Sequence, residues 1–212
     1  RKYIIPSAPG KRNNKDHKIT DLLYMCYQLA SHGINFDEVY GIIAKRYTDI
    51  CKQLSLDMGI EEILADIKYK IQEGATRDFT ASRGEYLNGI ILSKYLDFEF
   101  VDAKDLILFD EDRKFNMEKT KLKVESILSN KPYAVIPGFY GAKENGDIIT
   151  FSRGGSDITG AIIANGINPI LYENWTDVSG FYMADPKIVD HPRHIETITY
   201  KELRELSYMG AP

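Results

Sequence analysis

A glycine turn between a strand-like segment and a helix-like segment constrains the fold of this chain more than any other feature. Residues 148–151 have the β-branched and aromatic composition of a strand. Gly154 and Gly155 follow, and they let the backbone take a tight or positive-φ path that a Cβ atom would block. Ser156 or Asp157 is predicted to cap the helix that comes next. The N–H groups and the dipole at such a helix start attract a carboxylate or a phosphate.

Helical and strand-like patterns alternate through the rest of the chain. Helices are predicted over residues 19–30, 37–50, 60–71, 81–96, 117–128 and 200–209. Strands are predicted over residues 3–5, 99–101, 106–109, 133–138, 148–151 and 170–172. Asn145-Gly146 indicates a hairpin, and the polar residues 6–18 are predicted to form a mobile loop. This pattern predicts an α/β fold, a three-layer αβα sandwich with a largely parallel central sheet.

Composition narrows the class of protein further. The 212 residues favour one domain, and their 43% hydrophobic content is ordinary for a globular chain. The net charge of -4 argues against general nucleic-acid binding. Cys26 and Cys51 lie in helical patterns without a Cys-x-x-Cys spacing, so a reducing cytoplasm is expected. No apolar run reaches the roughly 18 residues of a membrane span, and no signal peptide is visible.

The predicted fold also predicts where a ligand binds. In open α/β sheets, ligands bind beyond the carboxyl ends of the parallel strands. The loops after residues 5, 136, 151 and 172 would gather there. Arg153, immediately before the glycines, can bind a carboxylate with two hydrogen bonds.

The run Arg153-Gly154-Gly155-Ser156-Asp157 resembles a sequence typical of aspartokinases, which belong to the amino-acid kinase family. Ser82-Arg83-Gly84-Glu85 is similar to the family's Ser-x-Gly-Glu element. Residues 7–11 with 19–23, and residues 175–187, resemble two further family segments, the last of them nucleotide-binding. The matches occur in the family's order and span nearly the whole chain.

The resemblance implies an ATP-dependent phosphotransferase with a carboxyl acceptor. An aspartate kinase moves the γ-phosphoryl group of ATP onto the side-chain carboxylate of L-aspartate, giving 4-phospho-L-aspartate. This is the first step of lysine, threonine and methionine biosynthesis. The resemblance further implies Mg²⁺ held mainly through the ATP phosphates, with no protein metal ligand. It implies a homo-oligomer for the full-length protein, and no nucleic-acid or membrane partner.

The resemblance also assigns roles on the substrate side. Arg153 would bind the α-carboxylate of the substrate, and Glu85 its ammonium group. Asp157 would orient Arg153 or the ammonium group, while Ser7 and Thr20 would lie near the reacting carboxylate. The catalytic set is therefore Arg153, Asp157, Thr20 and Ser7. The other expected substrate contacts are Phe139, which would line the pocket, and the backbone of Gly154, Gly155 and Ser156.

For ATP, the resemblance points to four residues near the carboxyl end of the chain. Thr176 and Asp177 match the family's adenosine-side residues, and Tyr182 could pack against the nucleotide. Lys187 would lie near the phosphates. The substrate-side part is expected over about residues 1–140 of a single partial kinase domain, and the nucleotide-side part over about 141–212.

Two departures from the family pattern leave alternatives open. The chain lacks the Lys-Phe-Gly-Gly-Ser segment whose lysine faces the transferring phosphoryl group, and it stops before the regulatory ACT domains. We therefore expect a catalytic-domain fragment missing both ends, which could bind ligands and be catalytically impaired. A sister kinase using glutamate, acetylglutamate or a nucleotide is a second alternative. Glu85 with Arg153 suits a free amino acid, and acetylglutamate lacks the free ammonium group.

Overall fold

The computed structural model describes residues 2–152, 154–175, 180–185, 188–199, 201–202 and 205. By packing, the chain divides into two compact units, Arg1–Ile170 and Leu171–Pro212. The named helices and strands all belong to the first unit. The predicted division at about residue 140 separates a substrate-binding part from a nucleotide-binding part, not two packed units. It stays a prediction.

Four helices form the first half of this unit. They are α1 (Ile19–Ser31), α2 (Asp37–Gln53), α3 (Ile60–Gln72) and α4 (Arg77–Leu96). Their apolar faces share one core, which includes Leu23, Ile43 and Tyr47. α4 begins one turn earlier than the apolar pattern predicts, because the side chain of Thr76 caps it by accepting the N–H of Phe79 at 3.1 Å.

The strands form two small sheets. In the first, β1 (Lys2–Ile4), β4 (Tyr133–Val135) and β2 (Glu99–Phe100) are parallel, in the order β1-β4-β2. In the second, β3 (Leu108–Phe109) runs parallel to β5 (Tyr140–Lys143), and β5 pairs antiparallel with β6 (Ile148–Thr150). The β5–β6 hairpin turns at Gly146, where φ is +91°, and this confirms the predicted turn.

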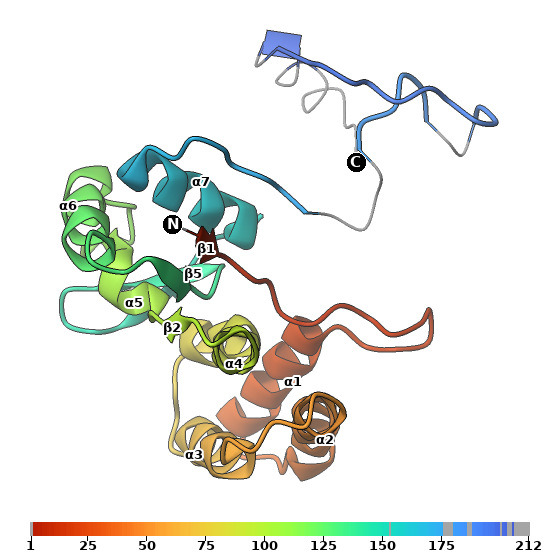
Figure 1. Cartoon of the computed structure of the whole chain (residues 1–212). Coiled ribbons are helices and arrows are strands. Elements are labelled where there is room, and N and C mark those ends of the chain that lie inside the picture. Colours follow the sequence, from red (N-terminus) through yellow and green to blue (C-terminus); the bar gives the residue numbers. More distant parts are fainter. Residues whose placement is uncertain are drawn as a thin grey trace. The chain divides into compact units, whose positions relative to one another are not determined.

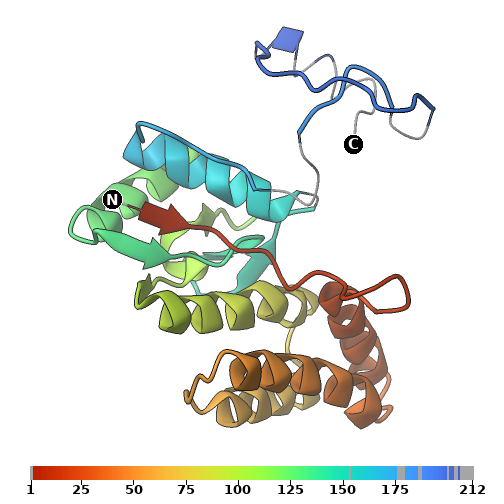
Figure 2. The same cartoon turned by 45° about the vertical axis from the view of Figure 1, so that its right-hand side comes forward.

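The three-layer α/β arrangement is confirmed. Figure 2 shows α7 (Gly155–Ile167) on one side of the strands and α4 on the other, with α1 to α3 packed beyond α4. α6 (Met117–Leu128) lies beside α7, and the short α5 (Ala103–Leu106) leads into β3 (Figure 1). α4 is therefore covered on both sides. A Cβ atom on its Gly89 would meet Pro137 Cγ at 3.0 Å, so the close packing of α4 requires this glycine.

Two further predictions concern the carboxyl-terminal part of the chain. The prediction of a strand over residues 170–172 was wrong. Neither sheet of the described residues includes them, and their side chains are exposed. Most of the predicted helix 200–209 lies outside the described residues. Cys26 and Cys51 are free and buried, and burial raises the pKa of the Cys26 thiol to about 12. Within the described part of the chain, no helix is long and apolar enough to cross a bilayer.

Candidate active site

The glycine turn after β6 forms as a strand-to-helix junction, with a different start from the predicted one. Gly154 is the N-cap of α7 in a left-handed conformation, with φ of 55° and ψ of 29°. The helix begins at Gly155, and no side chain caps it. Ser156 and Asp157 therefore lie inside the first turn, and the prediction that one of them is the cap was wrong. The positive φ at Gly154 turns the chain, so the helix starts before either side chain can cap it.

Gly155 is needed for a close approach of the loop between β4 and β5. A Cβ atom on Gly155 would lie 2.5 Å from Cδ2 and 2.7 Å from Cα of Phe139. Phe139 itself has a φ of 81°, which is rare for a residue with a side chain. Its N–H donates to the hydroxyl of Thr159 at 3.1 Å, and that hydroxyl donates to the carbonyl of Gly155 at 2.7 Å. Thr159 thus fixes Phe139 to the start of α7.

The same loop connects α7 to the end of β1. A Cβ atom on Gly138 would lie 2.5 Å from Oγ of Ser156, so Gly138 lets the loop lie directly against the first turn of α7. The N–H of Gly138 donates to the carbonyl of Pro6 at 3.1 Å. Because β1 and β4 are parallel neighbours, the residues that follow them, Ser7 and Phe139, leave the sheet at the same edge. This is the edge where a ligand is expected.

Glu85 on α4 is a buried acidic residue beside the loop after β1. Only 6% of the residue is exposed, and Oε2 is buried with no hydrogen-bond partner among the described residues. Burial raises the pKa of Glu85 to about 7. Backbone N–H groups of Glu85 and Ala8 and the charge of Arg83 act in the opposite direction and lower it less. An unpaired buried carboxylate is a site where a cation would be bound.

The loop after β1 lies against this carboxylate. The side-chain amide of Asn88, one turn after Glu85, donates to the carbonyl of Ser7 at 2.6 Å. A Cβ atom on Gly84 would lie 3.0 Å from Cβ of Ala8 and 3.3 Å from Cγ2 of Ile19, the first residue of α1. Thr20 follows Ile19 directly, so both ends of the loop reach the segment that carries Glu85.

Among the predicted site residues, the structure thus brings together two groups at one edge of the sheet. Ser7 and Glu85 form one group, with Thr20 directly after Ile19, which packs against Gly84; Phe139, Gly155 and Ser156 form the other group. Gly154 and Asp157 are exposed at the start of α7. Arg153, Thr176, Asp177 and Lys187 lie outside the described residues, and their assignments stay predictions.

Tyr182 belongs to the second unit. Residues 181–183 and 193–195 pair antiparallel through the hydrogen bonds Met183 N–H to Arg193 O and Ile195 N–H to Phe181 O. The rings of Tyr182 and His194 face each other with centroids 4.4 Å apart. They line an open hollow of about 480 Å³ together with Asp190, His191 and Pro192.

The sequence analysis did not predict several residues that contact the candidate site. Thr159, Asn88 and Ala8 support the site through hydrogen bonds or close packing. Each is a common residue type within a helix or loop, and each acts on a residue far away in the sequence. The spacing of residues along the chain carries no signal for such contacts.

Comparison with known proteins agrees with this geometry. Residues 28–212 match the model of the amino acid kinase family. The chain is 35% identical to aspartokinase 3 of Bacillus subtilis over 224 residues, which covers 99% of the chain and 49% of that relative. A crystal structure of Clostridium acetobutylicum aspartate kinase has a TM-score of 0.94 and 57% identity, and it covers the whole chain and 49% of the solved one.

A more distant structure shares the fold. Escherichia coli aspartokinase III, solved with aspartate and ADP, matches 99% of the chain and 50% of its own length with a TM-score of 0.68 at 20% identity. Fold, site and comparisons agree that the chain belongs to the amino acid kinase family. The relatives named above are aspartokinases, and the chain spans about half the length of each.

Proposed function

We propose that this chain carries out the aspartate kinase reaction, the transfer of the γ-phosphoryl group of MgATP to the side-chain carboxylate of L-aspartate. The amino acid kinase family and the similarity to aspartokinases over the whole chain support this proposal. The observation that carries it is the buried carboxylate of Glu85, which lies beside Ala8 of the loop after β1 and has one oxygen unpartnered among the described residues.

An amino-acid substrate fits that carboxylate. The ammonium group of L-aspartate would donate to Oε2 of Glu85, the oxygen that has no hydrogen-bond partner among the described residues. The α-carboxylate would bind at the start of α7, where Gly154, Gly155 and Ser156 offer backbone N–H groups. Arg153 would bind the same carboxylate from its side chain, Asp157 would orient Arg153 or the ammonium group, and Phe139 would line the pocket.

The reaction needs no general base, since the side-chain carboxylate of aspartate is already a nucleophile. One of its oxygens forms a bond to the γ-phosphorus of ATP, and the bond from that phosphorus to the β–γ bridging oxygen breaks, so ADP leaves with the electron pair. Ser7 and Thr20 would hold the reacting carboxylate in line by hydrogen bonding. Phosphoryl transfer of this kind depends on positioning and on stabilisation of charge.

The nucleotide would be bound by residues that follow α7 in the chain. Thr176 and Asp177 would contact the adenosine part, Tyr182 would pack against it, and Lys187 would approach the phosphates. Mg²⁺ would be bound mainly by phosphate oxygens and water, as this ion usually is. The ring of Tyr182, held against His194, supports a stacking role. We place the reaction in the cytoplasm, in keeping with two free cysteines. For a full-length protein we propose a homo-oligomer.

ADP release from MgATP tests the proposal, measured with L-aspartate, L-glutamate or no acceptor. A version extended by an N-terminal Lys-Phe-Gly-Gly-Ser segment is assayed in parallel. Aspartate-dependent release by either version would support an aspartate kinase, and release only by the extended one would show that the lysine segment is required. Release with glutamate alone would favour the sister kinase. Aspartate binding without release in both versions would identify a ligand-binding fragment.

A further inference from the structure

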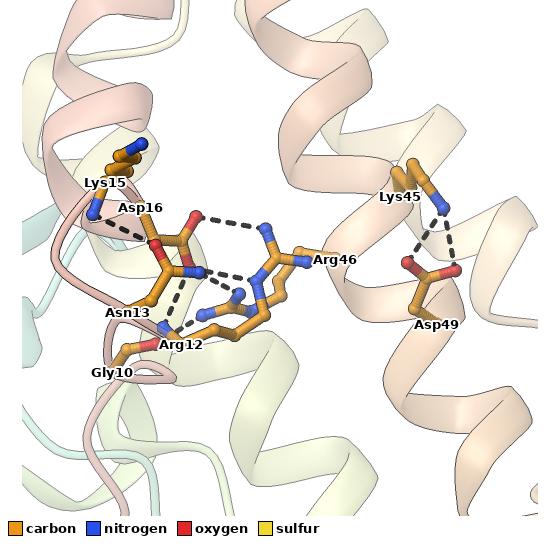
Figure 3. A network of polar contacts seen from close by, with 8 residues as sticks. All are labelled: Gly10, Arg12, Asn13, Lys15, Asp16, Lys45, Arg46 and Asp49. Atoms are coloured by element: carbon orange, nitrogen blue, oxygen red, sulfur yellow. Dashed lines mark hydrogen bonds and ion pairs between the residues drawn. The ribbon is translucent and has the colours of Figure 1, made fainter.

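The loop between β1 and α1 is tied to α2 by a network of charged side chains, although the sequence predicts it to be mobile. Nη1 of Arg46 on α2 donates to Oδ2 of Asp16 in the loop at 2.7 Å. Nη2 of Arg46 donates to the carbonyl oxygen of Gly10. Figure 3 shows Arg46 reaching from its helix across to both partners. One side chain thus holds the loop at two points six residues apart.

Arg12 completes the network from within the loop. Its backbone N–H and its Nε donate to Oδ2 of Asp16 at 2.9 and 3.0 Å, and its Nη2 donates to Oδ1 at 3.0 Å. These hydrogen bonds from Arg12, followed by the one from Arg46, hold the pKa of Asp16 well below its usual range. Asp16 is therefore ionised at any physiological pH, and two guanidinium groups share its charge.

The burial of this pair distinguishes it from an ordinary surface ion pair. The side chains of Arg46 and Asp16 are 6% and 9% exposed. The neighbouring pair on the same helix, Lys45 with Asp49, is 73% and 36% exposed, and the hydrogen bonds drawn for it in Figure 3 stay within that helix. Buried ion pairs are costly to desolvate and are weak evidence for stability, whereas they can fix one conformation among several. The pair of Arg46 and Asp16 fixes the conformation of the loop between β1 and α1.

α2 also fixes the opposite wall of the proposed amino-acid site. Tyr47, next to Arg46, is fully buried, and its hydroxyl donates to the carbonyl of Gly84 at 2.8 Å. Gly84 directly precedes Glu85. Consecutive residues of α2 therefore hold the loop and the segment that carries the substrate-binding carboxylate.

The hydrogen bond from Arg46 to Gly10 also restricts the position of Ala8. Only Pro9 lies between them, its ring sets φ near −65°, and the residue before a proline is restricted to extended conformations. Ala8 contributes a backbone N–H to Glu85 and packs against Gly84. At the other end, Asp16 lies three residues before Ile19, which also packs against Gly84. Displacing the loop would thus change the surroundings of Glu85 from two directions.

We propose that Arg46 and Asp16 are positioning residues for the amino-acid substrate: their buried ion pair holds the loop that follows β1 in the conformation that brings Ala8 and Ser7 to Glu85. The inference rests on the proposed function, and it concerns binding of the acceptor rather than of ATP. Neither side chain touches the substrate. Both act through the loop.

Kinetics of loop variants test this role. Arg46→Met alone leaves the largely buried carboxylate of Asp16 with one guanidinium partner, Arg12, in place of two, so Asp16→Asn/Arg46→Met, which removes both charges of the pair, is the main variant. We expect its aspartate KM to rise on the order of tenfold, because small misplacements near a site have large effects. The KM for ATP stays within about twofold, as expected when only the acceptor site is disturbed. Arg46→Lys keeps the charge and loses the second donor, so an intermediate aspartate KM is expected.

A second readout does not need catalysis. The loop contains the trypsin sites Lys11, Arg12, Lys15 and Lys18, so release from α2 should speed cleavage between residues 11 and 18. Aspartate should slow this cleavage in the parent chain and protect the double variant less. Lys45→Gln, which removes the exposed ion pair next to Arg46, is the matched control and should behave as the parent in both assays.

The outcomes separate this inference from the proposed function. A folded double variant with the parent's aspartate KM and cleavage rate would overturn the positioning role alone. An equal rise of both KM values would do the same, since it would indicate general loss of structure. A parent chain that neither turns over aspartate nor gains protection from it would remove the proposed function and this role together.

Discussion

A Cβ atom on Gly84 would lie 3.0 Å from the Cβ of Ala8. The two residues lie far apart in the sequence, one in α4 and one in the loop after β1. Their contact places the backbone of the loop beside Glu85. The absence of a side chain at position 84 therefore determines how closely the loop approaches the proposed amino-acid site.

Gly84→Ala should weaken aspartate binding more than it weakens the fold. The added methyl group must displace Ala8 or Ile19, and such overpacking costs about 1–3 kcal/mol. The gain in helix propensity offsets up to about 1 kcal/mol of this. Steady-state kinetics should show a several-fold higher aspartate KM, on the order of the losses seen for small displacements. Gly41→Ala on α2, where nothing lies within 4 Å, is the control and should leave the KM unchanged.

Aspartate binding should depend on pH through Glu85. With a pKa of about 7 in the free protein, Glu85 is mostly protonated at pH 6 and mostly ionised at pH 8. Only the ionised form attracts the ammonium group, so kcat/KM for aspartate should rise by roughly tenfold between these values. Glu85→Gln should lower kcat/KM and flatten the profile, while the ATP KM changes little. A parent profile as flat as that of the variant would argue against Glu85 as the ammonium partner.

The same substitution should stabilise the folded chain at high pH. The pKa of Glu85 is raised from 4.5 to about 7, so the folded state holds its proton more tightly than the unfolded state does. This contribution to stability is fully present below pH 4.5 and is lost as pH rises through 7. Urea denaturation should find Glu85→Gln more stable than the parent at pH 8, by up to about 3 kcal/mol.

At pH 4.5 that advantage of Glu85→Gln should disappear. Glu73→Gln, which makes the same substitution at the exposed end of α3, is the matched control. An advantage of Glu85→Gln that does not vary with pH would mean that the carboxylate is not destabilised by its burial.

Thr159→Val should lower both the stability of the fold and the affinity for aspartate. The change keeps the shape of the side chain, leaves the N–H of Phe139 without its partner and removes the hydroxyl that donates to the carbonyl of Gly155. An unsatisfied buried group costs about 1–3 kcal/mol, and the loop that carries Phe139 should also shift, so the aspartate KM should rise. Thr120→Val removes a comparable hydroxyl, which accepts the N–H of Leu108 at 2.9 Å away from the site.

The two valine variants should therefore behave alike in denaturation and differ in kinetics. Both should lower the free energy of unfolding, and only Thr159→Val should raise the aspartate KM. Thr159→Ser, which keeps the hydroxyl, should restore both quantities. If Thr120→Val raises the aspartate KM as much, the effect is a general one of stability.

Local patterns were enough to predict the architecture around the site. The strand, glycine turn and helix near residue 154, the hairpin at Gly146 and the alternation of helices with short strands are all properties of neighbouring residues. The start of α7 was misplaced because Ser156 and Asp157 are strong cap formers. The left-handed backbone of Gly154 made a cap by either side chain unnecessary.

Long-range polar contacts could not be predicted in this way. Arg46 lies between Lys45 and Tyr47 on a helix with many charges, and nothing nearby indicates that its partner is Asp16, thirty residues earlier. The apolar Ile42 of α2 is 45% exposed, while the charged Arg46 of the same helix is buried. Glu85 was found through family resemblance alone. Its burial depends on α1, α2 and the loop after β1, which pack together only in the folded chain.

The parallel pairing of β1 with β4 has a consequence for synthesis of the chain. Lys2 pairs with Tyr133, so about 130 residues separate the synthesis of β1 from that of β4. At ~5–20 residues per second, a ribosome needs roughly 7–26 s for that interval. The cluster of α1 to α4 emerges entirely within it and has its own apolar core. A nascent chain can thus bury the apolar faces of these helices before β1 and β4 pair.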